Sequence, residues 1–130
     1  MRQFHIFLAK IQCLSFGNKY GPVTEADLVF DVRCLPNPFY IEELRHLTGL
    51  DDRIKDYVMN DKKSQEFLER LLSLLNFSVP MYEAEGKSRL VIAVGCTGGR
   101  HRSVTIAEEI YKNLKSFGYH VSIRHRDIEK

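Results

Sequence analysis

Val91-Ile92-Ala93-Val94-Gly95-Cys96-Thr97-Gly98-Gly99-Arg100-His101-Arg102-Ser103 decides the fold of this chain. An apolar run typical of a buried strand leads into paired glycines, and three basic side chains stand where a helix would begin. Cations at a helix start cost roughly 0.3–1 kcal/mol each unless an anion is present, and glycines leave backbone amides open to a ligand. The stretch predicts a phosphate-binding glycine loop, and a plain tight turn with solvated basic residues is the simpler alternative.

Patterns on either side of this stretch predict alternating strands and helices. We expect strands in the latter part of residues 4–15 and near residues 28–33, 89–95 and 119–124, and helices near residues 39–46, 51–58, 64–82 and 102–117. The 28–33 run is typical of a strand covered on both faces, whereas the last strand alternates and suits a sheet edge. The fold class is therefore α/β, with three layers and a mainly parallel central sheet of about four strands that carries helices on both faces.

Three loops are expected to meet at one edge of this sheet. They span residues 16–22, 35–38 and 96–102, and each follows a predicted strand. Ligands of open parallel sheets bind beyond the carboxyl ends of the strands. This edge is the predicted site.

Length and composition favour one soluble domain over residues 1–130. The chain has 130 residues, 44% of them hydrophobic and 28% charged, and a net charge of only +2. Any nucleic-acid surface must therefore be local. No stretch suits a membrane span, and three cysteines without paired spacing favour a reducing cytoplasm, with no metal site and no cofactor expected. Cys13 and Cys34 are expected to be buried.

Cys96 and Arg102 also fit the C-x5-R spacing of cysteine-dependent phosphatases. A thiolate at a helix start would attack phosphorus while the arginine holds the phosphate. Asp31 is the only attractive general acid, although an ion pair with Arg33 is a competing role for it. A Cys96, Arg102 and Asp31 phosphatase is therefore kept as an alternative, and a structural dimerisation domain as a second one.

Basic residues elsewhere predict a possible RNA surface. Arg124 and Arg126 share one side of the last strand by alternation and could extend the basic loop. Tyr20, Phe39 and Tyr40 could supply stacking platforms. The complete set of predicted RNA contacts is Lys19, Arg100, Arg124, Arg126 and Lys130.

Five motifs in order resemble the carboxyl-terminal domain of the RapZ/YvcJ-like family of RNase adapter proteins. They are Ser15-Phe16-Gly17-Asn18-Lys19-Tyr20-Gly21, Phe30-Asp31-Val32-Arg33-Cys34-Leu35-Pro36-Asn37-Pro38, Leu47-Thr48-Gly49-Leu50-Asp51, Gly95 to Ser103, and His125-Arg126-Asp127-Ile128-Glu129-Lys130. The similarity covers nearly the whole chain. Because no G-x-x-x-x-G-K-[ST] pattern occurs, the amino-terminal P-loop domain of longer family members is not expected in this chain.

The resemblance implies a non-catalytic adapter that self-associates, binds RNA, senses glucosamine-6-phosphate and presents a small RNA to an endoribonuclease. A phosphate or phosphosugar would lie against Cys96, Thr97, Gly98, Gly99 and Arg102, with His101 and Ser103 completing the loop. Asp31, Arg33 and Asn37 would form the opposing wall. Tyr20 stands where sugar-sensing members have a histidine. The resemblance therefore implies that a phosphate binds, but it does not imply which sugar carries the phosphate.

Overall fold

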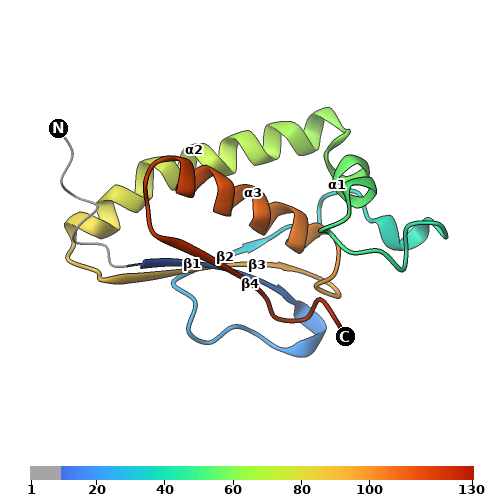
Figure 1. Cartoon of the computed structure of the whole chain (residues 1–130), viewed down its shortest axis with the longest axis horizontal. Helices are drawn as coiled ribbons and strands as arrows, with labels where there is room; N and C mark the ends of the chain where they lie inside the picture. Colours follow the sequence, from blue (N-terminus) through green and yellow to red (C-terminus); the bar gives the residue numbers. More distant parts are fainter. Residues whose placement is uncertain (1–9) are drawn as a thin grey trace.

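The chain forms a four-stranded sheet and three α-helices over residues 10–130, the part described by this computed structural model (Figure 1). In chain order the elements are β1 (Lys10–Gly17), β2 (Leu28–Asp31), α1 (Asp52–Met59), α2 (Lys62–Ala84), β3 (Arg89–Cys96), α3 (Arg102–Ser116) and β4 (Val121–His125). β1 contains the latter part of the apolar segment 4–15, where the first strand was predicted, and the start of that segment lies outside the described residues.

The sheet is parallel throughout and has the order β2-β3-β1-β4. This confirms the predicted parallel α/β class and the edge position of the last strand. β2 is the other edge strand, and its side chains alternate between half-buried and exposed, so the expectation that it is covered on both faces is wrong. Val29 is 58% exposed because it shares a face with Ala93, its partner on β3, and the cluster that covers this face around Val23 does not extend to β2.

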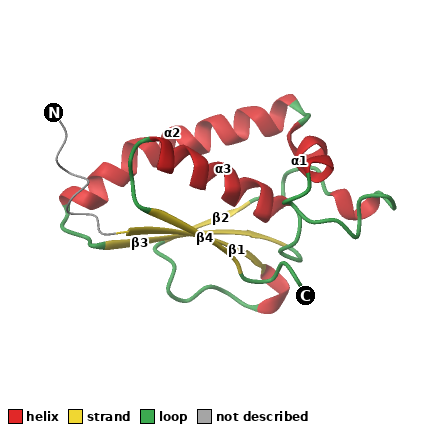
Figure 2. Cartoon of the chain, in the orientation of Figure 1, coloured by secondary structure: helices red, strands yellow, loops and turns green. Residues whose placement is uncertain are grey.

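The three α-helices lie on one face of the sheet (Figure 2). Ile92 and Val94 of β3 pack in one cluster with Ile106 and Ile110 of α3 and with the buried side of α2, including Leu75. This cluster contains the larger part of the core and fixes where α3 begins relative to the end of β3.

A connecting segment, rather than a helix, covers the opposite face. Leu14, Phe16 and Ala93 pack there against Val23 in residues 18–27. This ten-residue connection forms a single 3₁₀ turn at Asn18–Tyr20 and contains Gly21 and Pro22, which disfavour a longer helix. The third of the three predicted layers is therefore this connecting segment, which is thinner than a layer of helices.

Two helix starts follow simple capping chemistry. The Asp51 carboxylate accepts a hydrogen bond from the Arg53 amide, and Asp61 accepts one from Lys63 in the same way. The helix expected over residues 39–46 is replaced by a 3₁₀ turn at Pro38–Tyr40 and further turns. With Tyr40 exposed, this stretch has no continuous apolar stripe to bury.

Cys13 and Cys34, both predicted to be buried, differ in their exposure. Cys13 is buried as expected, and burial raises the pKa of its thiol to about 12. Cys34 is exposed, so the expectation for it is wrong; it follows the last residue of an edge strand by three positions. None of the helices in residues 10–130 is long and apolar enough to cross a membrane.

Candidate functional site

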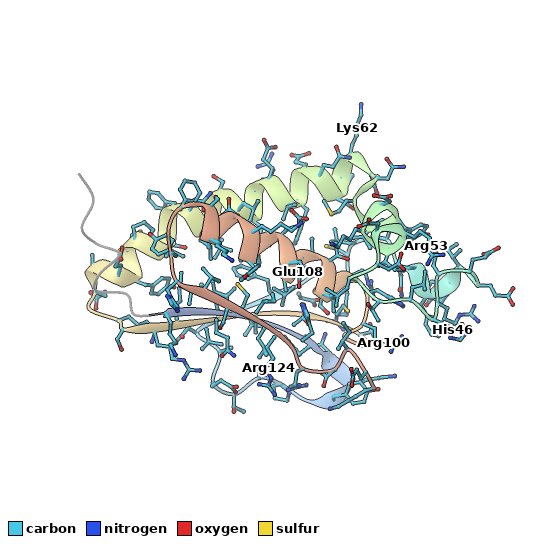
Figure 3. The ribbon with its side chains drawn as sticks, in the orientation of Figure 1. His46, Arg53, Lys62, Arg100, Glu108 and Arg124 are labelled. Carbon is cyan, nitrogen blue, oxygen red and sulfur yellow. The ribbon has the colours of Figure 1, made fainter. Side chains whose placement is uncertain are left out.

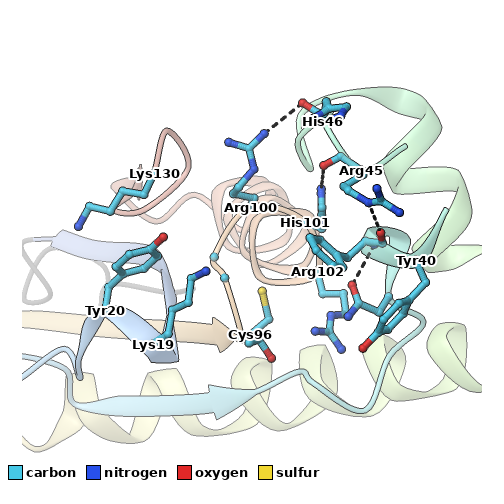
Figure 4. Close-up of a pocket in the computed structure, with 15 residues that line it drawn as sticks. Lys19, Tyr20, Tyr40, Arg45, His46, Cys96, Arg100, His101, Arg102 and Lys130 are labelled. Carbon is cyan, nitrogen blue, oxygen red and sulfur yellow. Dashed lines mark hydrogen bonds between the residues drawn. The ribbon is translucent and has the colours of Figure 1, made fainter. Parts of the chain in front are cut away.

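The carboxyl ends of the strands open into a cavity of about 580 Å³ (Figure 4). The pairing of Gly17 with Cys96, and of Asp31 with Gly95, brings three of these ends to one level. As predicted, the loops after β1, β2 and β3 all contribute to the cavity. Its lining residues are Lys19, Tyr20, Asn37, Phe39, Tyr40, Arg45, His46, Lys130 and the run from Cys96 to Arg102.

Backbone packing explains why the loop after β3 needs glycine at position 99. Gly99 has φ +79°, and a Cβ there would come within 2.6 Å of the Gly17 nitrogen. Gly17 is equally close-packed, since its own Cβ would lie 2.5 Å from the Gly98 carbonyl carbon. A Cβ on Gly98 would meet open space, so only this glycine of the pair leaves room for a ligand.

The loop presents backbone amides that the protein itself does not use. Among the described residues, none of the four amides from Gly98 to His101 donates a hydrogen bond. α3 begins directly afterwards, and its N-cap residue His101 supplies no side-chain cap. Consecutive free amides at a helix start form an anion-binding concavity.

Arg102 contributes the most informative side chain of the cavity. It is only 5% exposed, and its Nη1 donates to the carbonyls of Arg33 (2.7 Å) and Leu35 (3.3 Å). Its Nε is buried and has no hydrogen-bond partner among the described residues. A buried charged donor without a partner is costly, and an anion in the adjoining cavity would supply one.

His101 lines the cavity but directs its imidazole at the neighbouring loop. Nε2 lies 2.8 Å from the carbonyl of Leu47 and 3.1 Å from that of Arg45, so this nitrogen carries the proton and donates it. Burial lowers the pKa of His101, and hydrogen bonds to the two carbonyls only partly oppose this effect. The residue is therefore a neutral clamp on the 45–47 loop at pH 7, where the sequence predicted a ligand contact.

The charge of the cavity lining has one sign. Of the described residues, five cationic side chains and no carboxylate side chain line it. They are Lys19, Arg45, Arg100, Arg102 and Lys130. Arg100 also joins two segments by donating to the carbonyls of Ile128 and His46. Such a lining favours a ligand with more than one negative charge.

The predicted RNA residues separate into two groups. Lys19, Arg100 and Lys130 lie at the cavity, whereas Arg124 is exposed outside it, in register with Leu14 of β1 (Figure 3). Arg126 is held by the protein: it donates to the carbonyls of Gly21 and Pro22 and pairs with Asp127. Arg126 thus fastens the segment below the sheet.

Asp127 is a buried support that sequence reasoning missed. Its carboxylate accepts the Gly17 amide (2.7 Å) and pairs with Arg126 and Lys130. Burial alone would raise the pKa of Asp127, but hydrogen bonds from Arg126, Gly17 and Lys130 lower it to about 2. Its sequence signal was its place in the fifth family motif, directly after Arg126.

Only one of the three residues predicted to form the opposing wall lines the cavity. Asn37 lines the cavity, but Asp31 and Arg33 form an exposed ion pair of 2.7 Å and are not part of the lining. Hydrogen bonds from Arg33 lower the pKa of Asp31. Asp31 is therefore held as an anion, which is the wrong state for a general acid. Arg33 contributes through its carbonyl, which holds Arg102.

Cys96 and Ser103 lie beneath the glycine loop. Cys96 is buried at the cavity floor, and its thiol donates to the Ser103 hydroxyl at 3.2 Å. Ser103 is fully buried and is not among the lining residues. Among residues 10–130, no three His, Cys, Asp or Glu side chains are placed to hold a metal ion.

The loop after β2 contributes two cavity residues that the sequence did not predict, Arg45 and His46. Arg45 donates to the Phe39 carbonyl, and its guanidinium lies 5.2 Å from the centre of the Phe39 ring. His46 also lines the cavity. The turns at residues 38–47 bring these side chains to the site. Hydrophobic periodicity in the sequence does not predict such turns.

The fold and cavity define a parallel α/β domain whose pocket lies where such domains hold ligands, beyond the carboxyl ends of the strands. The sequence model of the RapZ C-terminal domain matches residues 9–129. The chain therefore belongs to the RapZ C-terminal domain family, as its five motifs predicted.

Relatives with the printed name "Nucleotide-binding protein" are similar over nearly the whole chain. One from Caldicellulosiruptor saccharolyticus is 54% identical over 134 residues, which covers 98% of this chain and 46% of the relative. Relatives from Thermoanaerobacter sp. (strain X514) and Clostridioides difficile are 60% and 58% identical, over 91% and 90% of this chain and 42% and 41% of their own lengths. The chain thus spans less than half of each of these relatives.

Proposed function

We propose that this domain is a non-catalytic sensor of a small phosphorylated ligand and that the same basic surface contacts RNA. The observation that carries the proposal is a combination found within residues 10–130: the buried Nε of Arg102 has no hydrogen-bond partner, four amides of the glycine loop donate to nothing, and the cavity lining has no carboxylate side chain. The phosphate would bind the amides of residues 98–101 and Arg102, with Lys19 and Lys130 at the mouth. The relatives' printed name also favours a phosphate-bearing ligand.

The charge of the cavity bears on which phosphosugar binds. Glucosamine-6-phosphate carries an amine that is cationic when protonated, and within residues 10–130 the lining provides five cations but no carboxylate side chain to receive it. We therefore expect glucose 6-phosphate, which lacks the amine, to bind at least as tightly as glucosamine-6-phosphate.

Titration calorimetry at low salt tests the phosphate site. Inorganic phosphate and both hexose phosphates should bind, and Arg102→Gln should weaken each by at least tenfold, whereas Arg70→Gln on the exposed side of α2 should change nothing. Because Arg102 also supports the fold, Lys19→Gln provides a second variant, with Lys62→Gln as its matched control. No binding of any phosphate compound to the folded protein would refute the proposal.

RNA binding is proposed because ligand and RNA phosphates would compete for the same cations. Arg124 adds an exposed cation without an ion pair among the described residues. A gel-shift titration with a structured RNA should weaken with salt, with Arg124→Ala and with added hexose phosphate. Lys62→Ala is the control. Affinity that is indifferent to salt and to Arg124 would contradict the RNA part.

Self-association and an endoribonuclease partner complete the adapter role, and both proposals derive from the family resemblance. Light scattering should give a mass above that of one 15.1 kDa chain. A monomer at micromolar concentration that still binds the hexose phosphate would remove self-association from the proposal and leave the sensor intact.

A further inference from the structure

We propose that the occupant of the cavity is a nucleoside 5′-monophosphate, with its phosphate on the glycine loop and its base against Tyr40. The group can be a free nucleotide or the phosphorylated 5′ end of an RNA strand. This inference rests on the proposed phosphate site and names the class of compound that fills the rest of the cavity.

The cavity has room for more than a phosphate. Its volume of about 580 Å³ falls within the range of roughly 300–1,000 Å³ that holds drug-sized ligands. Figure 4 shows Tyr20 and Tyr40 on opposite sides of Cys96, so the phosphate loop lies between two aromatic walls. A ligand held at the loop can extend to either wall.

The two walls differ in what already covers their rings. The ammonium groups of Lys19 and Lys130 lie 5.3 and 4.8 Å from the centre of the Tyr20 ring. The Tyr20 wall therefore gathers positive charge and suits the phosphate end of a ligand.

Tyr40 is the wall whose ring is available. Its side of the cavity is aromatic, since Phe39 meets the Tyr40 ring edge-on with centroids 5.8 Å apart at an angle of 84°. Among the described residues no cation lies over the Tyr40 ring, and the residue is 76% exposed. Exposed aromatic rings beside a cationic groove stack on nucleic-acid bases with little preference for sequence.

Asn37 adds a hydrogen-bond donor to the cavity lining. Its Oδ1 accepts the Phe39 amide at 3.1 Å, whereas its Nδ2 has no hydrogen-bond partner among the described residues. Asn37 lines the cavity, so this amide group can donate to a ribose hydroxyl or to the edge of a base. Phosphate, sugar and base thus each meet a matching group.

Binding of AMP and of ribose 5-phosphate to the same protein isolates the contribution of the base. We expect AMP to bind at least tenfold more tightly than ribose 5-phosphate, because only AMP carries a base to stack. Tyr40→Ala should erase this difference without weakening ribose 5-phosphate, and Tyr40→Phe should keep it. Tyr57→Ala, on α1 outside the cavity, is the matched control.

The outcomes separate this inference from the proposed function. If ribose 5-phosphate and AMP bind equally well to the wild-type protein, or if Tyr40→Ala weakens both equally, the nucleotide assignment is refuted while the phosphate site stands. If neither compound binds, the phosphate site fails as well.

Short RNA strands identify the source of the nucleotide. A tetranucleotide with a 5′ phosphate that binds as tightly as AMP supports an RNA end, and much weaker binding of that strand supports a free nucleotide. Equal binding of strands with a 5′ phosphate and a 5′ hydroxyl would overturn the proposal, because the glycine loop would then not be recognising the phosphate.

Discussion

At the scale of single residues, adjacent glycines in the loop after β3 have different tasks. Gly99 has a positive φ and touches the backbone of Gly17, so its lack of a side chain serves the fold. Gly98 faces open space in the cavity lining, so its lack of a side chain serves access to the amides. Sequence alone could not divide these tasks, because the contact with Gly17 joins residues far apart in the chain.

Alanine at each position tests this division. Gly99→Ala should destabilise the protein by about 1–3 kcal/mol, since alanine must adopt a positive φ and its Cβ would meet the Gly17 backbone. Gly98→Ala should leave the free energy of unfolding unchanged within about 0.5 kcal/mol and should weaken phosphate binding. Denaturant unfolding of both variants measures the difference, and equal destabilisation would contradict it.

Asp127 gives a pH-dependent prediction at the same scale. Its pKa is lowered from 3.8 to about 2 in the folded protein, so the stabilisation is present above pH 4 and is lost as the pH falls through 2. A shift of this size corresponds to about 2 kcal/mol. Asp127→Asn should therefore destabilise the protein by at least about that amount at pH 7.

The same variant should show a smaller deficit in acid. Unfolding free energies of the wild-type protein and Asp127→Asn should converge between pH 4 and pH 2, as the wild-type carboxylate becomes protonated. Val58→Ala, a buried apolar substitution that removes no titratable group, is the comparison that should show no such convergence. A deficit that stays constant with pH would exclude the charge of Asp127 as its cause.

At the scale of elements, the start of α3 is held by the loop before α1. His101 donates to the carbonyls of Arg45 and Leu47, and Arg100 donates to that of His46. These contacts place the side chains of Arg45 and His46 at the cavity. The helix start and the 45–47 loop therefore form one unit that shapes the site.

Protonation of His101 should loosen this unit. Burial lowers the pKa of His101 below 6.5, so the folded state binds fewer protons than the unfolded state and is destabilised as the pH falls below 6.5. NMR should show the Nε2–H tautomer at pH 7, and amide exchange in residues 44–50, corrected for intrinsic rates, should accelerate toward pH 5. A His101 that titrates above 6.5 would contradict this picture.

The lower layer of the fold depends on a second such unit. Arg126 ties Gly21 and Pro22 to the segment after β4, and its guanidinium lies 5.7 Å from the centre of the Phe16 ring. Arg126→Ala should therefore lower the free energy of unfolding by about 1–3 kcal/mol, whereas exposed Arg124→Ala should change it by less than about 0.5 kcal/mol. Equal effects of the two substitutions on stability would contradict the role given to Arg126.

At the scale of the whole molecule, local patterns predicted the sheet and the position of the cavity. The run from Val91 to Ser103 contains its own strand, turn and helix start, and Asp51 marks the start of α1, so short-range chemistry was sufficient there. The covering of the lower face, the Asp127 support and the direction of His101 depend on contacts between distant segments. Periodicity along the chain carries no information about such contacts.

The arrangement of the whole site also bears on catalysis. Asp31 is held as an anion by Arg33 and does not line the cavity, so none of the described residues that line it with Cys96 is a carboxylic acid. We expect no turnover of an aryl phosphate by the wild-type protein above the level of Cys96→Ser. Hydrolysis that Cys96→Ser abolishes would restore the phosphatase alternative.

A crystal structure grown with glucose 6-phosphate tests the central claim most directly. The phosphate should lie within about 2.7–3.1 Å of Arg102 Nε and of the amides of residues 98–101. Electron density for the ligand elsewhere, or a saturated crystal in which Arg102 Nε faces protein groups and the glycine loop is empty, would contradict it.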